Sequence, residues 1–145
     1  MDDQGPVHIT PGAEENGLAT MVADLVRQNL EAHPQRLADL SRLDLWLGIE
    51  ATDVEVGLTL VFSPGRLTVV DGILPRAEAL VTATSDAILD LSLLRIGRRG
   101  LPVLWDKPGR KVAGRFLRGE LKLRGTGAAG RLVRVLRLLS AAEAS

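Results

Sequence analysis

The spacing of apolar residues changes from one period to another along this chain. From Leu18 to Leu30, apolar residues recur every three or four positions, which predicts an amphipathic helix. From Leu43 to Ile49, and again over residues 54–62, apolar and polar residues alternate, which is typical of half-buried strands. A helix followed by strands of this kind predicts an α+β domain in which helices cover a sheet.

Turn-forming residues separate the later apolar segments. Ser63-Pro64-Gly65 and Asp71-Gly72 have the composition of tight turns. Two further strands are predicted between and after them, over residues 67–70 and 79–84. If consecutive strands pair through hairpins, the four strands form an antiparallel meander.

The C-terminal part is predicted to add helices and a fifth strand. Ser85 is expected to cap a leucine-rich helix that ends at Gly97. A helix from Pro108, a short strand over residues 120–124 and a final amphipathic helix follow. The predicted fold class is therefore α+β, with a five-stranded, mostly antiparallel sheet and helices packed on one face.

Length and composition indicate one globular domain. The chain has 145 residues, of which 46% are hydrophobic and 25% are charged, values that fit a single well-formed core. Residues 1–16 contain Gly-Pro and Pro-Gly pairs and few large apolar side chains. We therefore expect a flexible lead-in over residues 1–16, one domain over residues 17–140 and a short tail over residues 141–145.

Targeting signals are missing from the sequence. No apolar run approaches the roughly 20 residues of a spanning helix, and Asp2 and Asp3 stand where a secretory signal carries positive charge. Cysteine is absent, which excludes disulfides and thiolate sites. We expect a cytoplasmic protein, and the excess of arginine over lysine is typical of a GC-rich bacterial genome.

Charge is distributed unevenly although the net charge is zero. Residues 1–91 hold 5 basic and 15 acidic side chains, whereas residues 92–137 hold 13 basic and 2 acidic ones. This division indicates either a basic face for an anionic partner or neutralisation between two parts of the folded surface. Nucleic acid is not the expected partner, because the basic segment lacks interleaved aromatic residues and a known reading motif.

A glycine motif at residues 125–130 matches G-x-G-x-x-G between a predicted strand and a predicted helix. That is the local context of a dinucleotide fingerprint. Only 15 residues follow Gly130, too few for the helix and the second parallel strand that the fingerprint needs. A tight turn and a helix cap account for the glycines.

Residues suited to catalysis are scarce. His8 lies in the predicted lead-in and His33 at a helix end, and neither has a nucleophile nearby in the sequence. The acidic residues between positions 44 and 55 are interpreted as the polar face of two strands, because a hard cation needs convergent oxygen ligands. We expect no catalytic residue, no metal and no cofactor.

Several local patterns, in their order along residues 18–139, resemble the sterol carrier protein 2 (SCP2) family of lipid-binding domains. The most specific is Gly119-Glu120-Leu121-Lys122-Leu123-Arg124-Gly125 followed by an apolar helix. The others are Val56-Gly57-Leu58-Thr59-Leu60, Gly65-Arg66-Leu67-Thr68-Val69, Ala79-Leu80-Val81-Thr82-Ala83-Thr84 and the helix beginning Ser85-Asp86. The resemblance implies a hydrophobic tunnel between sheet and helices, and binding or transfer of fatty acids, acyl-CoA, phospholipids or sterols without catalysis.

Strand alternation and helix stripes select the expected tunnel walls. From the sheet these are Leu45, Leu47, Leu58, Leu60 and Phe62, and from the helices Leu91, Leu94, Phe116, Leu117, Leu132 and Leu136. Arg131 and Arg134 are expected to contact an anionic headgroup or a membrane at the rim. The alternative is a protein-interaction or accessory domain with a solid core that assists a lipid-metabolising enzyme.

Overall fold

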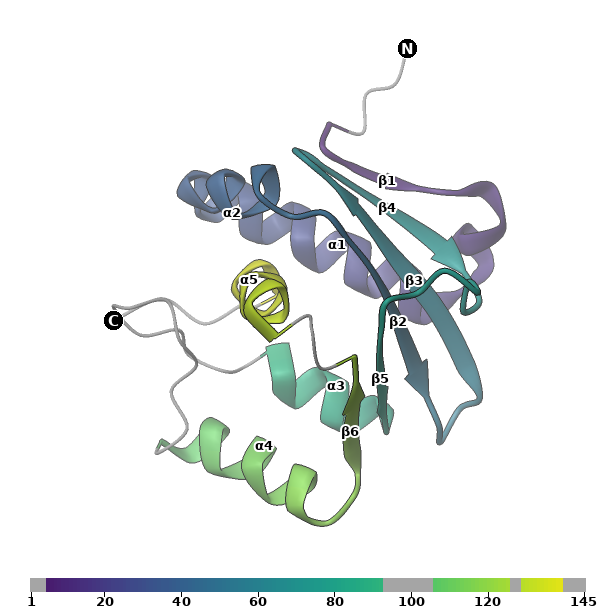
Figure 1. Cartoon of the computed structure of the whole chain (residues 1–145), viewed down its shortest axis with the longest axis vertical. Helices are drawn as coiled ribbons and strands as arrows, with labels where there is room; N and C mark the ends of the chain where they lie inside the picture. The colour runs from purple at the N-terminus through teal and green to yellow at the C-terminus, as the bar shows by residue number, and fades with distance from the viewer. Residues whose placement is uncertain (1–4, 93–105, 126–128, 140–145) are drawn as a thin grey trace.

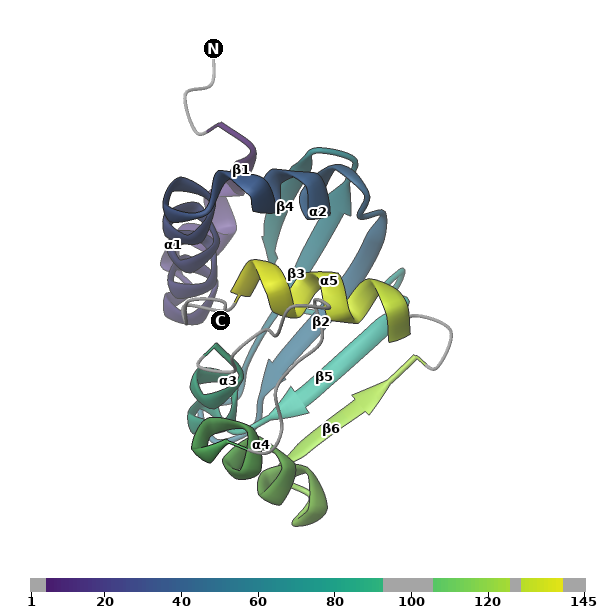
Figure 2. The ribbon, with the colours of Figure 1, turned by 90° about the vertical axis from the view of Figure 1, so that its left-hand side faces the viewer.

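Six strands form one sheet, and the helices lie on one of its faces (Figures 1 and 2). This computed structural model describes residues 5–92, 106–125 and 129–139. The strands are β1 (Val7–Ile9), β2 (Leu45–Ala51), β3 (Val56–Ser63), β4 (Arg66–Asp71), β5 (Ala79–Ala83) and β6 (Leu121–Arg124). The helices are α1 (Gly17–Ala32), α2 (Leu37–Ser41), α3 (Ser85–Ser92), α4 (Lys107–Leu117) and α5 (Ala129–Leu139), with 3-10 turns over Pro11–Glu15 and Pro34–Arg36.

The elements predicted from apolar spacing occur close to their expected positions. The α+β class and the helices on one face are confirmed, and the sheet has six strands rather than five. The predicted end of the leucine-rich helix at Gly97 and the tail over residues 141–145 lie outside the described residues.

The additional strand lies in the segment that was expected to be a flexible lead-in. β1 pairs in parallel with β4, and the backbone amide of Leu67 donates to the carbonyl oxygen of Pro6 at 2.8 Å. Val7 is fully buried. Residues 7–15 thus contain a strand and a 3-10 turn, and the predicted flexible lead-in is wrong for them. The sequence gives no signal for this strand, because three residues are too few to show an alternating pattern.

The strand order corrects the predicted four-stranded meander. The order is β1-β4-β3-β2-β5-β6, so β2, β3 and β4 form the antiparallel meander and β5 lies parallel to β2 on its other side. The chain reaches β5 by crossing the sheet face opposite the helices. There the side chain of Ile73 lies 3.1–3.3 Å from where a Cβ of Gly48 or Gly57 would stand. These two glycines leave the space that the crossing segment fills.

The hydrogen bonds of Thr59 hold the crossing segment on this face. Its hydroxyl donates to the carbonyl oxygen of Gly72 at 2.8 Å and accepts from the amide of Leu74 at 2.9 Å. Thr59 is a fully buried polar residue, so these two bonds satisfy a group that burial would otherwise penalise.

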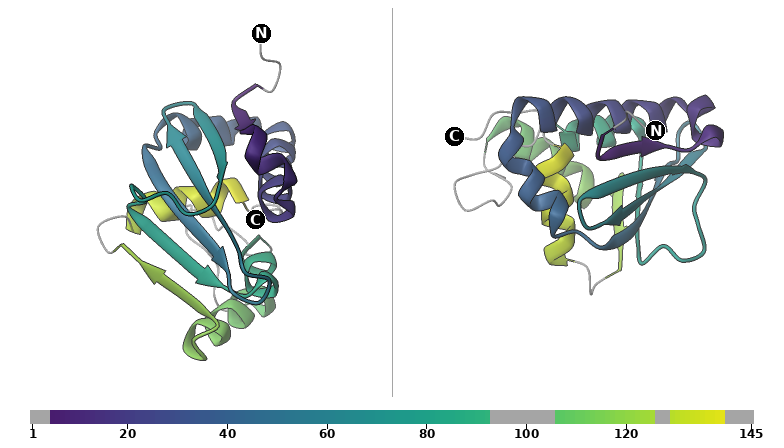
Figure 3. Two further views of the ribbon diagram at one scale, coloured as in Figure 1. Left: turned by 90° about the vertical axis from the view of Figure 1, so that its right-hand side faces the viewer. Right: turned by 90° about the horizontal axis from the view of Figure 1, so that it is seen from above.

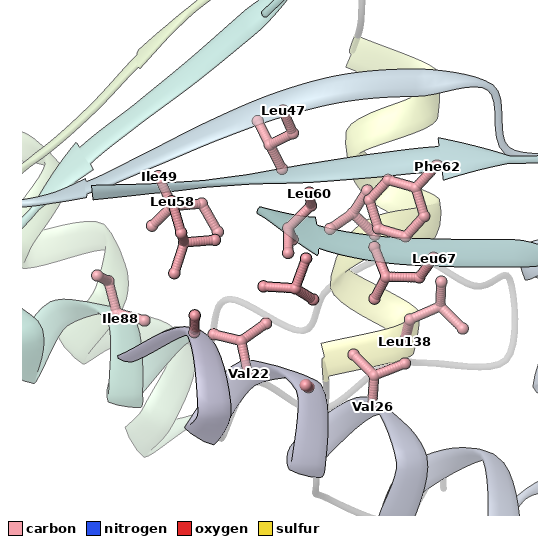
Figure 4. Close-up of a cluster of buried hydrophobic side chains, with 14 of the residues drawn as sticks. Val22, Val26, Leu47, Ile49, Leu58, Leu60, Phe62, Leu67, Ile88 and Leu138 are labelled. Atoms are coloured by element: carbon pink, nitrogen blue, oxygen red, sulfur yellow. The ribbon is translucent and has the colours of Figure 1, made fainter. Parts of the chain in front are cut away.

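The closed part of the core lies between the meander and two helices (Figure 4). Strand register places Leu47 opposite Leu60, and Leu60 opposite Val69, so one row of apolar side chains faces the helices. Val26 of α1 and Leu138 of α5 pack against this side of the sheet. Alternation along each strand therefore produces the buried face that the sequence predicts.

Two buried asparagines fix helix α1. Asn16 caps its start by accepting from the amide of Ala19, and its side-chain amide donates to the carbonyl oxygen of Gly57 and to the carboxylate of Asp71. Near the other end, Asn29 donates to the carbonyl oxygen of Leu138 at 2.9 Å, which ties α1 to α5. The two helices therefore hold a set position above the sheet (Figure 3).

Helix α3 is capped by the residue before the one that the sequence indicates. The hydroxyl of Thr84 accepts from the amide of Ala87, so Thr84 rather than Ser85 is the cap. Ser85 instead donates from its amide and its hydroxyl to the carboxylate of Asp53, at 2.8 and 2.6 Å. The hydroxyl first and then the amide lower the pKa of Asp53 below its usual value.

This contact predicts a pH-dependent contribution to stability. A lowered pKa in the folded state stabilises the fold above the unfolded pKa of about 3.9, and this stabilisation is lost as the pH falls through the folded pKa. We expect the free energy of unfolding, measured in urea, to fall as the pH is lowered below about 4. This fall should be smaller for Asp53→Asn than for the parent chain, because asparagine does not titrate. Ser85→Ala keeps the amide donor and should show an intermediate loss. An identical pH dependence in all three chains would contradict this assignment.

Candidate functional site

An apolar cavity of about 150 Å³ lies between the sheet and the helices. Among the residues that the structure describes, every one that lines it is hydrophobic. The lining residues are Met21, Val22 and Leu25 of α1, Leu47 and Ile49 of β2, Val81 of β5, Ile88 of α3, Phe116 of α4, Leu121 and Leu123 of β6, and Leu132, Val135, Leu136 and Leu139 of α5.

Strand register and helix periodicity together build this wall. Ile49 lies opposite Val81, and Val81 lies opposite Leu123, so one apolar row crosses β2, β5 and β6. On the other side, the four lining residues of α5 follow offsets of 0, 3, 4 and 7, which place them on one helix face. The cavity is thus located where these two apolar surfaces face each other without filling the space.

The cavity meets solvent beside α4 and β6. Phe116 and Leu123 both line it, and their exposed fractions are 55% and 48%. Most of the other lining residues are buried or partly buried. Phe116 and Leu123 therefore form the rim of the cavity.

The volume limits what the cavity holds in this conformation. An engineered apolar cavity of about 150 Å³ accommodates benzene, whereas sites that enclose drug-sized ligands measure roughly 300–1,000 Å³. The cavity therefore has room for a short apolar segment of a ligand. A longer chain has to displace rim side chains or extend past them.

An ion-pair network positions α4 and hence the rim. Asp90 of α3 is buried and accepts from Nε of Arg115 at 2.5 Å, with Nζ of Lys111 at 3.5 Å. Arg115 also contacts Glu120 at 2.9 Å, just before β6. The hydrogen bond that Arg115 donates to Asp90 raises the pKa of Arg115. Phe116 follows Arg115 in the chain and is held at the rim by the same contacts.

The arginines of α5 pair with acidic residues of the N-terminal part. Arg131 contacts the Glu78 carboxylate at 3.2 Å, and Arg134 and Arg137 contact Asp39 of α2 at 3.3 and 2.8 Å. Mutual neutralisation, one of the two interpretations of the uneven charge, therefore accounts for these three arginines. The predicted headgroup contact of Arg131 and Arg134 stays a prediction.

Comparison with solved structures identifies the fold. A structure titled UbiJ-SCP2 ubiquinone synthesis protein is similar, with a TM-score of 0.59 and 18% sequence identity, over 87% of this chain and 96% of that one. This chain has an SCP2-like fold. No family model matches its sequence, and no curated protein matches it either.

Two further structures are similar to this SCP2-like chain. The sec-alkylsulfatase Pisa1 from Pseudomonas sp. has a TM-score of 0.51 and 22% identity, over 74% of this chain and 14% of the sulfatase. The match thus spans a small part of that enzyme. Sterol carrier protein 2 from Yarrowia lipolytica has a TM-score of 0.49 and 14% identity, over 83% of this chain and 89% of that one.

The structure separates the predicted tunnel residues into three groups. Leu47, Phe116, Leu132 and Leu136 line the cavity. Leu45, Leu58, Leu60 and Phe62 face the helices but belong to the closed core. Leu117 is 86% exposed, and Leu94 and the side chain of Leu91 lie outside what the structure describes. Ligand contact by any of these residues stays a prediction.

The sequence reasoning missed the contribution of α1. Its apolar stripe was recognised, but Met21, Val22 and Leu25 were not assigned to the tunnel wall. Ile49 and Val81 also line the cavity and were not predicted, although Ile49 belongs to the same alternating row as Leu47. Alternation finds the buried face of a strand, and it carries no signal for which part of that face stays unfilled.

The described ranges contain neither a metal cluster nor a membrane-spanning helix. No group of three or more His, Asp or Glu residues there is placed to hold a metal ion. None of the described helices has both the length and the apolar character needed to cross a membrane.

Proposed function

We propose that this SCP2-like domain binds or transfers a hydrophobic ligand, such as a fatty acid, acyl-CoA, phospholipid or sterol-like molecule, and is not an enzyme. The observation that carries the proposal is the cavity of about 150 Å³, whose fourteen lining residues within the described part of the chain are all hydrophobic. Binding would be driven by the removal of apolar ligand surface from water, because none of these fourteen side chains offers a strong hydrogen bond.

The volume gives an estimate of affinity. A segment of about six carbons, the size of benzene, gains roughly 5 kcal/mol at about 0.8 kcal/mol for each buried methylene. That corresponds to a dissociation constant of roughly 0.1–1 mM before the costs of association are subtracted. Micromolar binding of a long acyl chain therefore requires the rim beside Phe116 and Leu123 to open and admit more of the chain.

The composition of the cavity wall also supports a role without catalysis. None of the fourteen lining side chains that the structure describes can transfer a proton or act as an activated nucleophile at ordinary pH. Aliphatic walls select by shape and dispersion, so we expect a broad preference for apolar chains over polar molecules.

Native mass spectrometry of freshly purified protein is the test. We expect adduct masses that disappear on denaturation, and extraction should identify the retained molecule as a lipid. A chain that carries no adduct and takes up no added fatty acid would contradict the proposal. That outcome would favour the accessory-domain alternative.

A further inference from the structure

Three strongly exposed apolar side chains gather at the edge where α4 meets β6. Phe116 and Leu117 end α4 with exposed fractions of 55% and 86%, and Leu123 in β6 is 48% exposed. α4 lies beside β6 at one end of the molecule (Figure 2). Phe116 and Leu123 border the same cavity, which places the group at the cavity rim. A leucine side chain that is 86% exposed gains almost none of the stabilisation that burial would give, unless a partner covers it.

Basic residues accompany this apolar group. Arg110 precedes Leu117 by seven positions, about two helical turns, so both side chains lie on the same side of α4. Lys107 lies one turn further toward the start of the helix, next to Arg110. Lys122 and Arg124 are next to Leu123 in the edge strand, but strand alternation directs their side chains to the opposite face of the sheet. All four are exposed, and none forms an ion pair within the residues that the structure describes.

Internal pairing does not account for these four cations. Lys111 and Arg115 contact Asp90, and Arg118 contacts Glu120 at 2.7 Å, so other basic residues of the same segment have acidic partners. Within the described part of the chain, Lys107 and Arg110 therefore place unpaired positive charge beside the exposed apolar side chains. Leucine and phenylalanine beside lysine and arginine are the combination that binds in the interface of anionic membranes.

We propose that this rim face, formed by Phe116, Leu117, Leu123, Lys107 and Arg110, docks on an anionic lipid surface. Leu117 enters the interface between headgroups and acyl chains, and the cations contact the headgroups. The inference deepens the proposed function, because docking here brings the cavity rim to the lipid, so that a ligand passes between membrane and cavity without crossing water. This location differs from the one expected from the sequence at Arg131 and Arg134, which form ion pairs with Glu78 and Asp39.

The test is flotation of the full chain with vesicles of phosphatidylcholine alone or mixed equally with phosphatidylglycerol. We expect binding to the anionic vesicles that weakens as salt shortens the Debye length from about 10 Å at 0.1 M to about 3 Å at 1 M. Leu117→Ser should bind roughly tenfold more weakly. Lys107→Gln with Arg110→Gln should lose about fivefold for each charge removed.

Matched controls use residues away from the rim face. Leu37 in α2 is 46% exposed, and Leu37→Ser removes an apolar side chain of the same kind. Arg42 and Arg66 are exposed, and their double replacement by glutamine removes the same charge. Both controls should bind vesicles like the parent chain. Equal losses in controls and rim variants, or binding that ignores both salt and phosphatidylglycerol, would overturn the proposal.

Uptake of a fluorescent fatty acid in the absence of vesicles separates this inference from the proposed function. Leu117 does not line the cavity, so Leu117→Ser should retain parental uptake while vesicle binding falls. A chain that binds vesicles as expected but takes up no fatty acid contradicts the cavity function and supports the docking face. If Leu117→Ser instead turns a dimer into a monomer in sedimentation and leaves vesicle binding unchanged, the face contacts a second copy and the membrane proposal is wrong.

Discussion

Replacing Gly125 with alanine is expected to lower the free energy of unfolding by roughly 3–5 kcal/mol. Gly125 follows β6 with a φ of +101°, a conformation that costs a residue with a side chain about 1–3 kcal/mol. An added Cβ would also stand 2.6 Å from the carbonyl oxygen of Glu78 and 2.8 Å from Cα of Ala79. Both are backbone atoms at the start of β5, where the amide of Glu78 is bonded to Trp46 of β2, so they have little freedom to move.

Alanine at a second glycine, Gly65, measures the cost of backbone strain without a steric clash. Gly65 in the turn between β3 and β4 has a φ of +79°, and a Cβ there would meet no atom within 4 Å. Gly65→Ala should therefore cost only about 1–2 kcal/mol. Urea unfolding of both variants gives the comparison, with a drop in melting temperature on the order of 10 °C for Gly125→Ala. Equal losses at the two positions would mean that the contact with β5 does not constrain position 125.

The same contact gives the first glycine of the G-x-G-x-x-G motif a structural reason. A phosphate-binding fingerprint uses its glycines to admit a ligand close to the backbone. Here the group that approaches Gly125 is the backbone of β5 itself. The sequence context had already indicated a turn, but the strand that requires glycine at this position is 46 residues away in the chain and gives no local signal.

Local elements were predictable from the sequence, whereas their pairing was not. The alternation of residues 43–49 and 54–62 sets the hairpin of β2 and β3, because neighbouring strands close a short loop at low entropic cost. β5 pairs with β2 after the chain has crossed the sheet, where Ile73 lies over Gly48 and Gly57, positions that are distant in the sequence. Apolar periodicity does not detect such contacts, so a meander was the simpler prediction.

The candidate site was predictable to a similar extent. Helix stripes and strand alternation identify the surfaces that meet, which is why Leu47 and Leu132 were selected and do line the cavity. They do not give the distance between those surfaces. Phe62 and Leu60 have the same local pattern as Leu47, but they lie where α1 and α5 pack closely on the sheet. Leu117, at the end of α4, is turned away from the core because Val112 and Phe116 provide the inward face of that helix.

Phenylalanine in place of Val22 or of Val26 is expected to give opposite results. Both valines are in α1, one turn apart, with exposed fractions of 2% and 1% (Figure 4). Val22 lines the cavity and Val26 does not. A phenyl ring at position 22 can occupy existing space, so the unfolding free energy should stay within about 1 kcal/mol of the parent value. At position 26 the ring must displace close-packed neighbours, at a cost of about 1–3 kcal/mol.

Ligand affinity should fall in Val22→Phe, the more stable of the two variants, and stay unchanged in Val26→Phe. A ring that excludes the equivalent of only two ligand methylenes removes about 1.6 kcal/mol, so Val22→Phe should bind a fluorescent fatty acid at least tenfold more weakly. Val26→Phe should keep the parental dissociation constant under conditions where it is folded. Urea unfolding and fluorescence titration of the same two samples provide both readouts.

The paired design distinguishes a carrier from a solid accessory domain. In a domain whose core is filled, both positions are packed alike, and both substitutions destabilise by similar amounts without a specific loss of ligand. In a carrier, stability and affinity change independently, because the space that tolerates the ring is the space that the ligand needs. Retention of full fatty-acid affinity by a stable Val22→Phe chain would show that the ligand, if any, binds elsewhere. The cavity between α1, α5 and the sheet would then have no part in the function.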